Sequence, residues 1–127
     1  MAGNKYGARK VTAPDGQVFD SKREYHRWCE LRLLERAGRI SDLKRQVSYE
    51  LIPSQREKST EVYKAGPQKG LLKPGKLIEK PCTYVADFVY NEDGKTAVED
   101  TKGHKTEAYK IKRKLMLWVH NIKVKET

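Results

Sequence analysis

The sequence has few of the residues that build disulfide frameworks, zinc sites or membrane spans. Its 127 residues include only two cysteines, Cys29 and Cys82, and neither lies in a C-x-x-C pair. The three histidines are scattered and unpaired with cysteines, so zinc is not expected. No apolar run follows Met1 or reaches the length of a membrane span. These absences predict a reduced, cytoplasmic protein with no membrane partner.

Acidic residues are outnumbered by basic ones. Seventeen Asp and Glu face 27 Lys and Arg, which leaves a net charge of +10. A small domain this basic repels itself unless a polyanion binds it, so nucleic acid is the favoured partner. The alternative interpretation is a generally solubilising surface.

Periodicity and turn residues predict a single α/β (α+β) domain over residues 1–127. Residues 1–10 read as a basic arm, and the turn Ala13-Pro14-Asp15-Gly16 predicts a small N-terminal hairpin. The later elements are expected to be a helix over 21–37, a strand over 40–51, a hairpin over 82–102, a helix over 106–120 and a short terminal strand around 122–124.

Two further patterns bear on this architecture. Residues 53–81 hold four prolines, three glycines and seven Lys or Arg, and we expect a long basic loop or insertion there. In the second helix, Ala108, Ile111 and Leu115, followed by Trp118 or Val119, have the spacing of a buried stripe.

The predicted hairpin over 82–102 carries the residues with the most informative chemistry. Asp87 interrupts an apolar strand, and Asp100 and Lys102 share one face of the next strand. A two-residue loop at Asp93-Gly94, or a four-residue loop, sets Asp87 opposite Asp100, whereas a three-residue loop sets it opposite Glu99. Facing carboxylates are destabilising unless a cation neutralises them, and hard cations such as Mg²⁺ favour carboxylate oxygens.

Each of these residues also has a plainer interpretation. Asp100 and Lys102 could form an ordinary ion pair at a sheet edge. Glu24 stands three residues after Ser21, and this capping box explains it as a helix-start residue. Trp28 and Trp118 read as core residues.

Four segments in order resemble the PD-(D/E)XK nuclease superfamily, and in particular a small branch common in bacteriophage genomes. The segments are Phe19-Asp20-Ser21-Lys22-Arg23-Glu24, then Gln46, then Tyr84-Val85-Ala86-Asp87-Phe88, then Glu99-Asp100-Thr101-Lys102-Gly103. The resemblance implies a restriction-endonuclease-like αβββαβ core, with a mixed central sheet flanked by two helices.

The resemblance also implies the roles of the site residues. Asp87, Asp100 and Glu24 would bind Mg²⁺ or Mn²⁺ together with the backbone carbonyl of Thr101, and Lys102 would position or activate the attacking water. Asp stands at position 100 where Glu is commoner in the superfamily, so Glu99 remains an alternative ligand.

Together these features predict a metal-dependent DNA endonuclease. By the resemblance, this enzyme would prefer branched DNA such as Holliday junctions as its substrate. It would act in phage DNA processing in the host cytoplasm, and symmetric cutting of a junction would require a homodimer. The alternatives are a non-catalytic basic DNA-binding protein, a less selective nickase, and the nuclease subunit of a larger complex. The expected DNA contacts are Lys5, Arg9, Lys10, Lys22, Arg23, Gln46, Lys105, Lys110, Arg113 and Lys114.

Overall fold

The computed structural model describes residues 9–127, so Lys5 and most of the expected basic arm lie outside the described residues. The described chain divides into two compact units. The main unit comprises residues 9–49 and 84–127, and the inserted unit comprises residues 50–83. The inserted unit nearly coincides with the segment expected to be a basic insertion, residues 53–81.

The main unit begins with the predicted hairpin and helix. Strand β1 (Val11–Thr12) pairs antiparallel with β2 (Val18–Phe19), and Gly16 supplies the positive φ of 90° that the turn requires. Helix α1 (Lys22–Arg36) starts after Ser21, whose side chain accepts a hydrogen bond from the backbone N–H of Glu24. Both elements confirm the sequence prediction.

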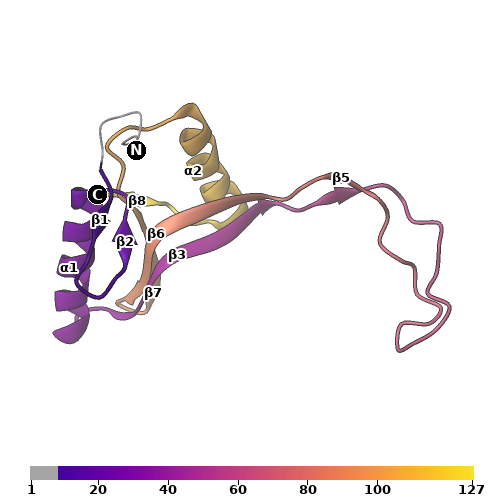
Figure 1. The fold of residues 1–127 in the computed structure, drawn as a ribbon, viewed down its shortest axis with the longest axis horizontal. Coiled ribbons are helices and arrows are strands. Elements are labelled where there is room, and N and C mark those ends of the chain that lie inside the picture. The colour runs from indigo at the N-terminus through magenta and orange to yellow at the C-terminus, as the bar shows by residue number, and fades with distance from the viewer. Residues whose placement is uncertain (1–8) are drawn as a thin grey trace. The chain divides into compact units, whose positions relative to one another are not determined.

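A mixed four-stranded sheet forms the centre of the fold (Figure 1). Its strands are β3 (Ser41–Ile52), β6 (Cys82–Glu92), β7 (Lys95–Asp100) and β8 (Lys125–Glu126), in the spatial order β3-β6-β7-β8. Strands β6 and β7 are antiparallel, whereas β7 and β8 are parallel. The chain thus has a mixed α+β fold, and its terminal strand lies at 125–126, just beyond the predicted 122–124.

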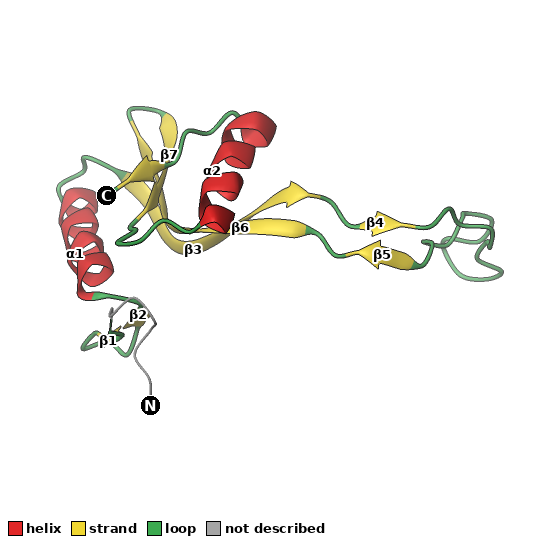
Figure 2. Ribbon diagram, turned by 90° about the horizontal axis from the view of Figure 1, so that it is seen from above, coloured by secondary structure: helices red, strands yellow, loops and turns green. Residues whose placement is uncertain are grey.

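Helices α1 and α2 (Glu107–His120) lie on either side of this sheet (Figure 2). On the α1 side, Leu31 and Ile40 are buried against Phe88 and Tyr90. The ring of Trp28 stacks on Phe88 with the centroids 6.1 Å apart. This cluster fixes α1 against the β6–β7 hairpin, and so sets where the first turn of the helix meets the sheet.

The predicted buried stripe of α2 is wrong. Tyr109 and Met116 are the buried residues of this helix, whereas the side chain of Ile111 is 57% exposed and that of Trp118 is 86% exposed. Both stripes have helical spacing, and the sheet selects the one that lets the Tyr109 ring approach Tyr84, with centroids 6.4 Å apart. Trp118 is therefore not a core residue.

The inserted unit contains a two-stranded ribbon of its own. Strand β4 (Gln55–Arg56) pairs antiparallel with β5 (Leu77–Glu79), with an irregularity in the register between Gln55 and Arg56. Leu77 and Ile78 thus lie in β5, which is separate from the following strand β6. Between residues 9 and 127, no helix is long and apolar enough to cross a membrane.

Candidate functional site

The β6–β7 hairpin has the two-residue loop among the registers considered above. Glu92 pairs with Lys95 and Phe88 pairs with Glu99. Asp93 and Gly94 both have positive φ, of 52° and 77°, as a tight type I′ loop requires. Continuing this register by one residue brings Asp87 opposite Asp100.

Both oxygens of Asp87 accept hydrogen bonds. Its Oδ2 accepts the backbone N–H of Thr101 at 2.9 Å, which ties the strand to the residue that follows β7. Its Oδ1 accepts from Nε2 of Gln46 on β3 at 3.3 Å. The same Nε2 donates to Oε2 of Glu24 at 3.2 Å, so one amide group links the carboxylates of Glu24 and Asp87.

Glu24 combines two roles through its two oxygens. Its Oε1 accepts the backbone N–H of Asp20 at 2.9 Å, just before the start of α1, as a capping residue does. Its Oε2 faces Gln46 and also lies 3.8 Å from the guanidinium of Arg45. The residue is only 2% exposed, so the capping contact holds a buried carboxylate beside Asp87.

Gln46 has an unusual backbone. Its φ is 53°, although it lies within strand β3 and is not glycine. A residue other than glycine, asparagine or aspartate in this left-handed region is strained by about 1–2 kcal/mol. In this conformation the side chain of Gln46 bridges Glu24 and Asp87, and the surrounding contacts offset the strain.

Asp100 is fully buried between a tyrosine and a lysine. Its Oδ2 accepts a hydrogen bond from the hydroxyl of Tyr84 at 2.5 Å. Its Oδ1 forms no hydrogen bond of good geometry, although Nζ of Lys102 forms an ion pair with it at 3.2 Å. Lys102 also lies over the ring of Tyr109, 5.0 Å from its centroid. Among residues 9–127, the partner of this buried carboxylate oxygen is thus a single flexible cation.

The three carboxylates of this cluster all have raised pKa values. Burial is the main cause for Glu24, and burial followed by repulsion from Glu24 raises the pKa of Asp87. Burial and the neighbouring Asp87 charge raise the pKa of Asp100 to about 6. The surroundings therefore disfavour the charged form of each of the three carboxylates.

Glu99 differs from Asp100, and the difference bears on which acid can be a ligand. Arg27 of α1 donates to both Glu99 oxygens at 2.8 Å, and the hydroxyl of Tyr90 donates to Oε2. Burial alone would raise the pKa of Glu99, but these hydrogen bonds and the Arg27 charge together outweigh it and lower that pKa. Glu99 is thus a satisfied structural group, which favours Asp100 as the available acid.

A family model described as "Protein of unknown function (DUF1064)" matches residues 3–126. The chain belongs to this family. No curated protein and no solved structure matches the chain. The family's description names no activity, so the chemistry of this DUF1064 member has to be judged from its site.

The donor chemistry of the cluster suits a hard divalent cation. Such ions bind through one or two carboxylates, and Oδ1 of Asp100 is a buried oxygen that lacks a hydrogen bond. Over residues 9–127, however, no group of three His, Cys, Asp or Glu side chains is arranged to hold a metal ion. Gln46 and Lys102 are among the groups that contact these carboxylates.

The residues expected to contact DNA fall into three groups. The exposed ones are Arg9, Lys10, Lys22, Arg23 and Lys114. Of these, Lys22 and Arg23 lie next to Glu24 at the start of α1. Lys105 and Arg113 both pair with Glu126, at 3.5 and 3.0 Å, and Lys110 pairs with Glu107 at 3.2 Å. Gln46 differs from all of these, because its amide is engaged by the carboxylates.

Two residues of the site were missed by the sequence analysis. The guanidinium of Arg45 lies 3.7 Å from the ring centroid of Phe19 and donates to the backbone oxygen of Val18 at 3.0 Å, which places it beside Glu24. Tyr84 holds Asp100. The position of Tyr84 three residues before Asp87 was visible, but its partner lies on another strand and sequence alone does not reveal the pairing.

Proposed function

We propose that this chain is a divalent-metal-dependent DNA endonuclease that hydrolyses phosphodiester bonds. The observation that carries the proposal is the β6–β7 register, which sets Asp87 opposite Asp100 with Lys102 paired to Asp100 and buried Glu24 alongside. The order α1-β3-β6-β7-α2-β8 supports it, because the PD-(D/E)XK resemblance implies an αβββαβ core with its site on the central hairpin.

The raised pKa values give the proposal its electrostatic support. A protein that buries three carboxylates together, each with a raised pKa, stabilises them best when a cation binds. Glu24, Asp87 and Asp100 would hold Mg²⁺ or Mn²⁺, with the Thr101 carbonyl as a further ligand by analogy. The bound ion would neutralise charge and polarise a phosphoryl oxygen.

The remaining residues would position the attacking water, the phosphate and the metal-binding carboxylates. Lys102 would donate hydrogen bonds to the attacking water and to the phosphate as negative charge develops there. The hydrogen bond from Thr101 keeps Asp87 against the end of β7, and Tyr84 fixes Asp100. Arg23 and Lys22 are exposed at the start of α1, where they would contact backbone phosphates.

The substrate proposed is branched DNA such as a four-way junction, in the processing of phage DNA. Symmetric cutting of such a junction would require two copies of the chain, which light scattering on the junction-bound protein would detect. The surface charge supports phosphate binding without base reading, since residues 102–125 hold eight Lys or Arg and a single acid.

The test compares Lys102→Ala with Lys95→Ala, which removes an exposed lysine from the other end of the same hairpin. Each protein is incubated with four-way junction, flap, duplex and single-stranded DNA in Mg²⁺, Mn²⁺ or EDTA. We expect metal-dependent nicks by the wild type and by Lys95→Ala, and a loss of about a hundredfold or more for Lys102→Ala with DNA binding retained.

The same panel separates the alternatives. Strong metal-dependent cutting by Lys102→Ala would contradict the proposal, and DNA binding with no cutting in any condition would favour a non-catalytic binder. Cutting of every substrate at similar rates would favour a less selective nickase.

A further inference from the structure

The inserted unit is an ordered ribbon whose ladder continues beyond β4 and β5. The backbone N–H of Glu57 donates to the oxygen of Lys76, and that of Lys73 donates to the oxygen of Glu61, each at 2.8 Å. At Gly75 the strands approach so closely that a Cβ atom would lie 1.7 Å from the oxygen of Glu57. Glycine is therefore required at position 75. The two backbone segments of the ribbon are hydrogen-bonded to each other up to the closing loop.

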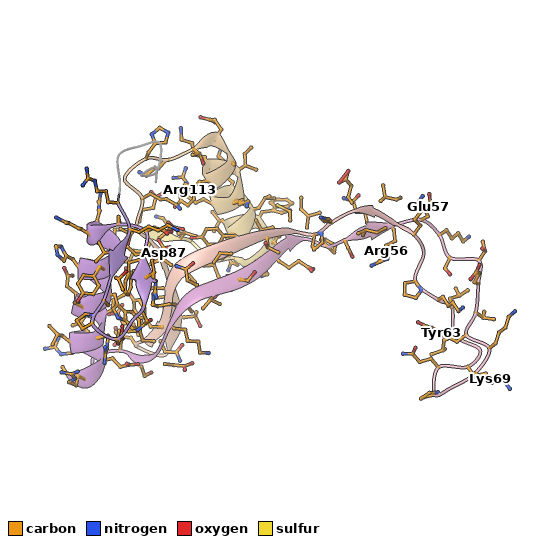
Figure 3. The ribbon with its side chains drawn as sticks, viewed as in Figure 1. Arg56, Glu57, Tyr63, Lys69, Asp87 and Arg113 are labelled. Carbon is orange, nitrogen blue, oxygen red and sulfur yellow. The ribbon has the colours of Figure 1, made fainter. Side chains whose placement is uncertain are left out.

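The closing loop, residues 62–73, is defined by its own hydrogen bonds, and we call it the tip loop. Val62 and Leu72 form a β-bridge, and the backbone N–H of Tyr63 donates to the oxygen of Leu71 at 2.9 Å. The N–H of Gly70 donates back to the oxygen of Tyr63, also at 2.9 Å. Figure 3 shows Tyr63 and Lys69 at this end of the ribbon, and Arg56 and Glu57 farther along it.

The tip loop exposes large apolar side chains. Leu71 is 61% exposed, Leu72 is 62% exposed and Val62 is 42% exposed. Pro67 lies in the same loop, and every residue from Lys64 to Leu72 is exposed. Adjacent leucines presented on a hydrogen-bonded loop suggest a surface that is covered when a partner binds.

The charge around these leucines indicates the partner. Residues 62–78 contain four lysines, Lys64, Lys69, Lys73 and Lys76, and no acid. Lysines on both sides of a small apolar wedge complement phosphates that flank bases. A two-stranded ribbon is also narrow enough to enter a DNA groove, and DNA-bending proteins insert leucine or proline between base steps.

We infer that the tip loop is a second DNA-contacting site, in which Leu71 and Leu72 pack against unstacked bases while the neighbouring lysines contact the flanking phosphates. The site binds branched DNA better than continuous duplex, because the bases at a branch point are already partly unstacked and less energy is needed to expose them. The inference rests on the proposed function only in taking DNA as the ligand, and it requires no cutting.

The test measures binding in EDTA, where cutting is suppressed, to a four-way junction and to a duplex of the same sequence. Leu71→Ser/Leu72→Ser is compared with Leu77→Ser/Ile78→Ser, which removes two exposed apolar residues from β5, outside the tip loop. We expect the tip variant to bind the junction about tenfold more weakly and the duplex within twofold of wild type. The β5 variant should bind both as the wild type does.

A charge variant tests the phosphate contacts. Lys64→Gln/Lys69→Gln/Lys73→Gln should weaken binding to both DNAs and reduce the slope of log K against log salt by about 2 to 3. A junction with 2-aminopurine at its centre should brighten when wild-type protein binds and should not brighten with the leucine variant. The aminopurine signal of the wild type tests the wedge even if the leucine variant folds poorly by circular dichroism.

Several outcomes would overturn the inference. Equal loss of junction and duplex binding in the leucine variant would remove the role of unstacked bases, and unchanged binding in both tip variants would remove the site. The loop would be assigned to a membrane surface if the tip variants lost binding to phosphatidylserine vesicles while their DNA binding stayed unchanged. The nuclease proposal would fail separately, if the wild-type protein bound the junction in EDTA but did not cut it in Mg²⁺.

Discussion

Glu99 and Asp100 are adjacent on β7 and equally inaccessible to solvent, yet their pKa values are shifted in opposite directions. Glu99 receives a bidentate guanidinium from Arg27, and its pKa is lowered. Asp100 has one tyrosine hydroxyl and one lysine, faces Asp87 across the hairpin, and its pKa is raised to about 6. Burial alone thus does not set the direction of a carboxyl pKa shift, which depends on whether the surrounding groups already satisfy the charge.

The largest expected difference between the two acids is in DNA cutting. Asp100→Asn should lower the rate of metal-dependent cleavage by about a hundredfold or more, because it removes a proposed metal carboxylate. Glu99→Gln should lower it by less than about tenfold at a temperature where the variant remains folded, since Glu99 is bound by Arg27 and Tyr90 and is not a proposed metal ligand. Single-turnover cleavage of a four-way junction measures both; equal losses would erase the distinction.

The next contrast is in stability. Glu99→Gln should lower the free energy of unfolding by about 3 kcal/mol, because it removes the buried partner of Arg27 and leaves this part-buried charge paired with the exposed Glu30. Arg27→Met/Glu99→Met removes both charges and should be less destabilised than the sum of the single variants. Urea unfolding in EDTA provides the measurement, and additive losses would contradict a coupled pair.

Asp100→Asn should have the opposite sign, and its effect should depend on pH. A carboxylate whose folded pKa is raised destabilises the folded state when charged, so without metal the variant should be more stable than the wild type above pH 6. The advantage, of the order of 1–3 kcal/mol, should shrink as pH falls from about 6 and be absent near pH 4. Urea unfolding at several pH values in EDTA checks this; a constant difference would show that Asp100 does not titrate in this way.

The smallest expected difference in stability concerns Gln46, whose amide links Glu24 and Asp87. Gln46→Gly and Gln46→Ala both remove the amide and should lower cleavage by about tenfold. Glycine tolerates the positive φ at this position, so Gln46→Gly should be about 1 kcal/mol more stable than Gln46→Ala. Equal stability of the two variants would mean that the backbone at position 46 is not strained.

Local patterns account for the parts of the molecule that were predicted. The Ser21 cap identified the start of α1, and the two-residue loop at Asp93-Gly94 that the hairpin has was one of the three alternatives considered. These features depend on residues within a few positions of one another, where turn and capping rules apply directly. They were sufficient to place Asp87 and Asp100 on facing strands.

The parts that were not predicted depend on distant partners. Arg27 and Glu99 are 72 residues apart, so the sequence could not show which acid of the Glu99-Asp100 pair is satisfied. The buried side of α2 was predicted wrongly because this helix is apolar on more than one face, and the sheet selects Met116 instead of Ile111. The left-handed backbone of Gln46 likewise has no local signal, since glutamine rarely adopts it.

The exposure of Trp118 gives the protein a built-in optical label. The sequence holds two tryptophans, and they lie in different surroundings: Trp118 faces solvent on α2, whereas Trp28 stacks on Phe88, the neighbour of Asp87. Trp118→Phe would leave Trp28 as the single tryptophan, beside the carboxylate cluster, and Trp28→Phe would leave a red-shifted tryptophan on the basic helix. One protein thus offers two separate spectroscopic views, one of the interior next to Asp87 and one of the surface of α2.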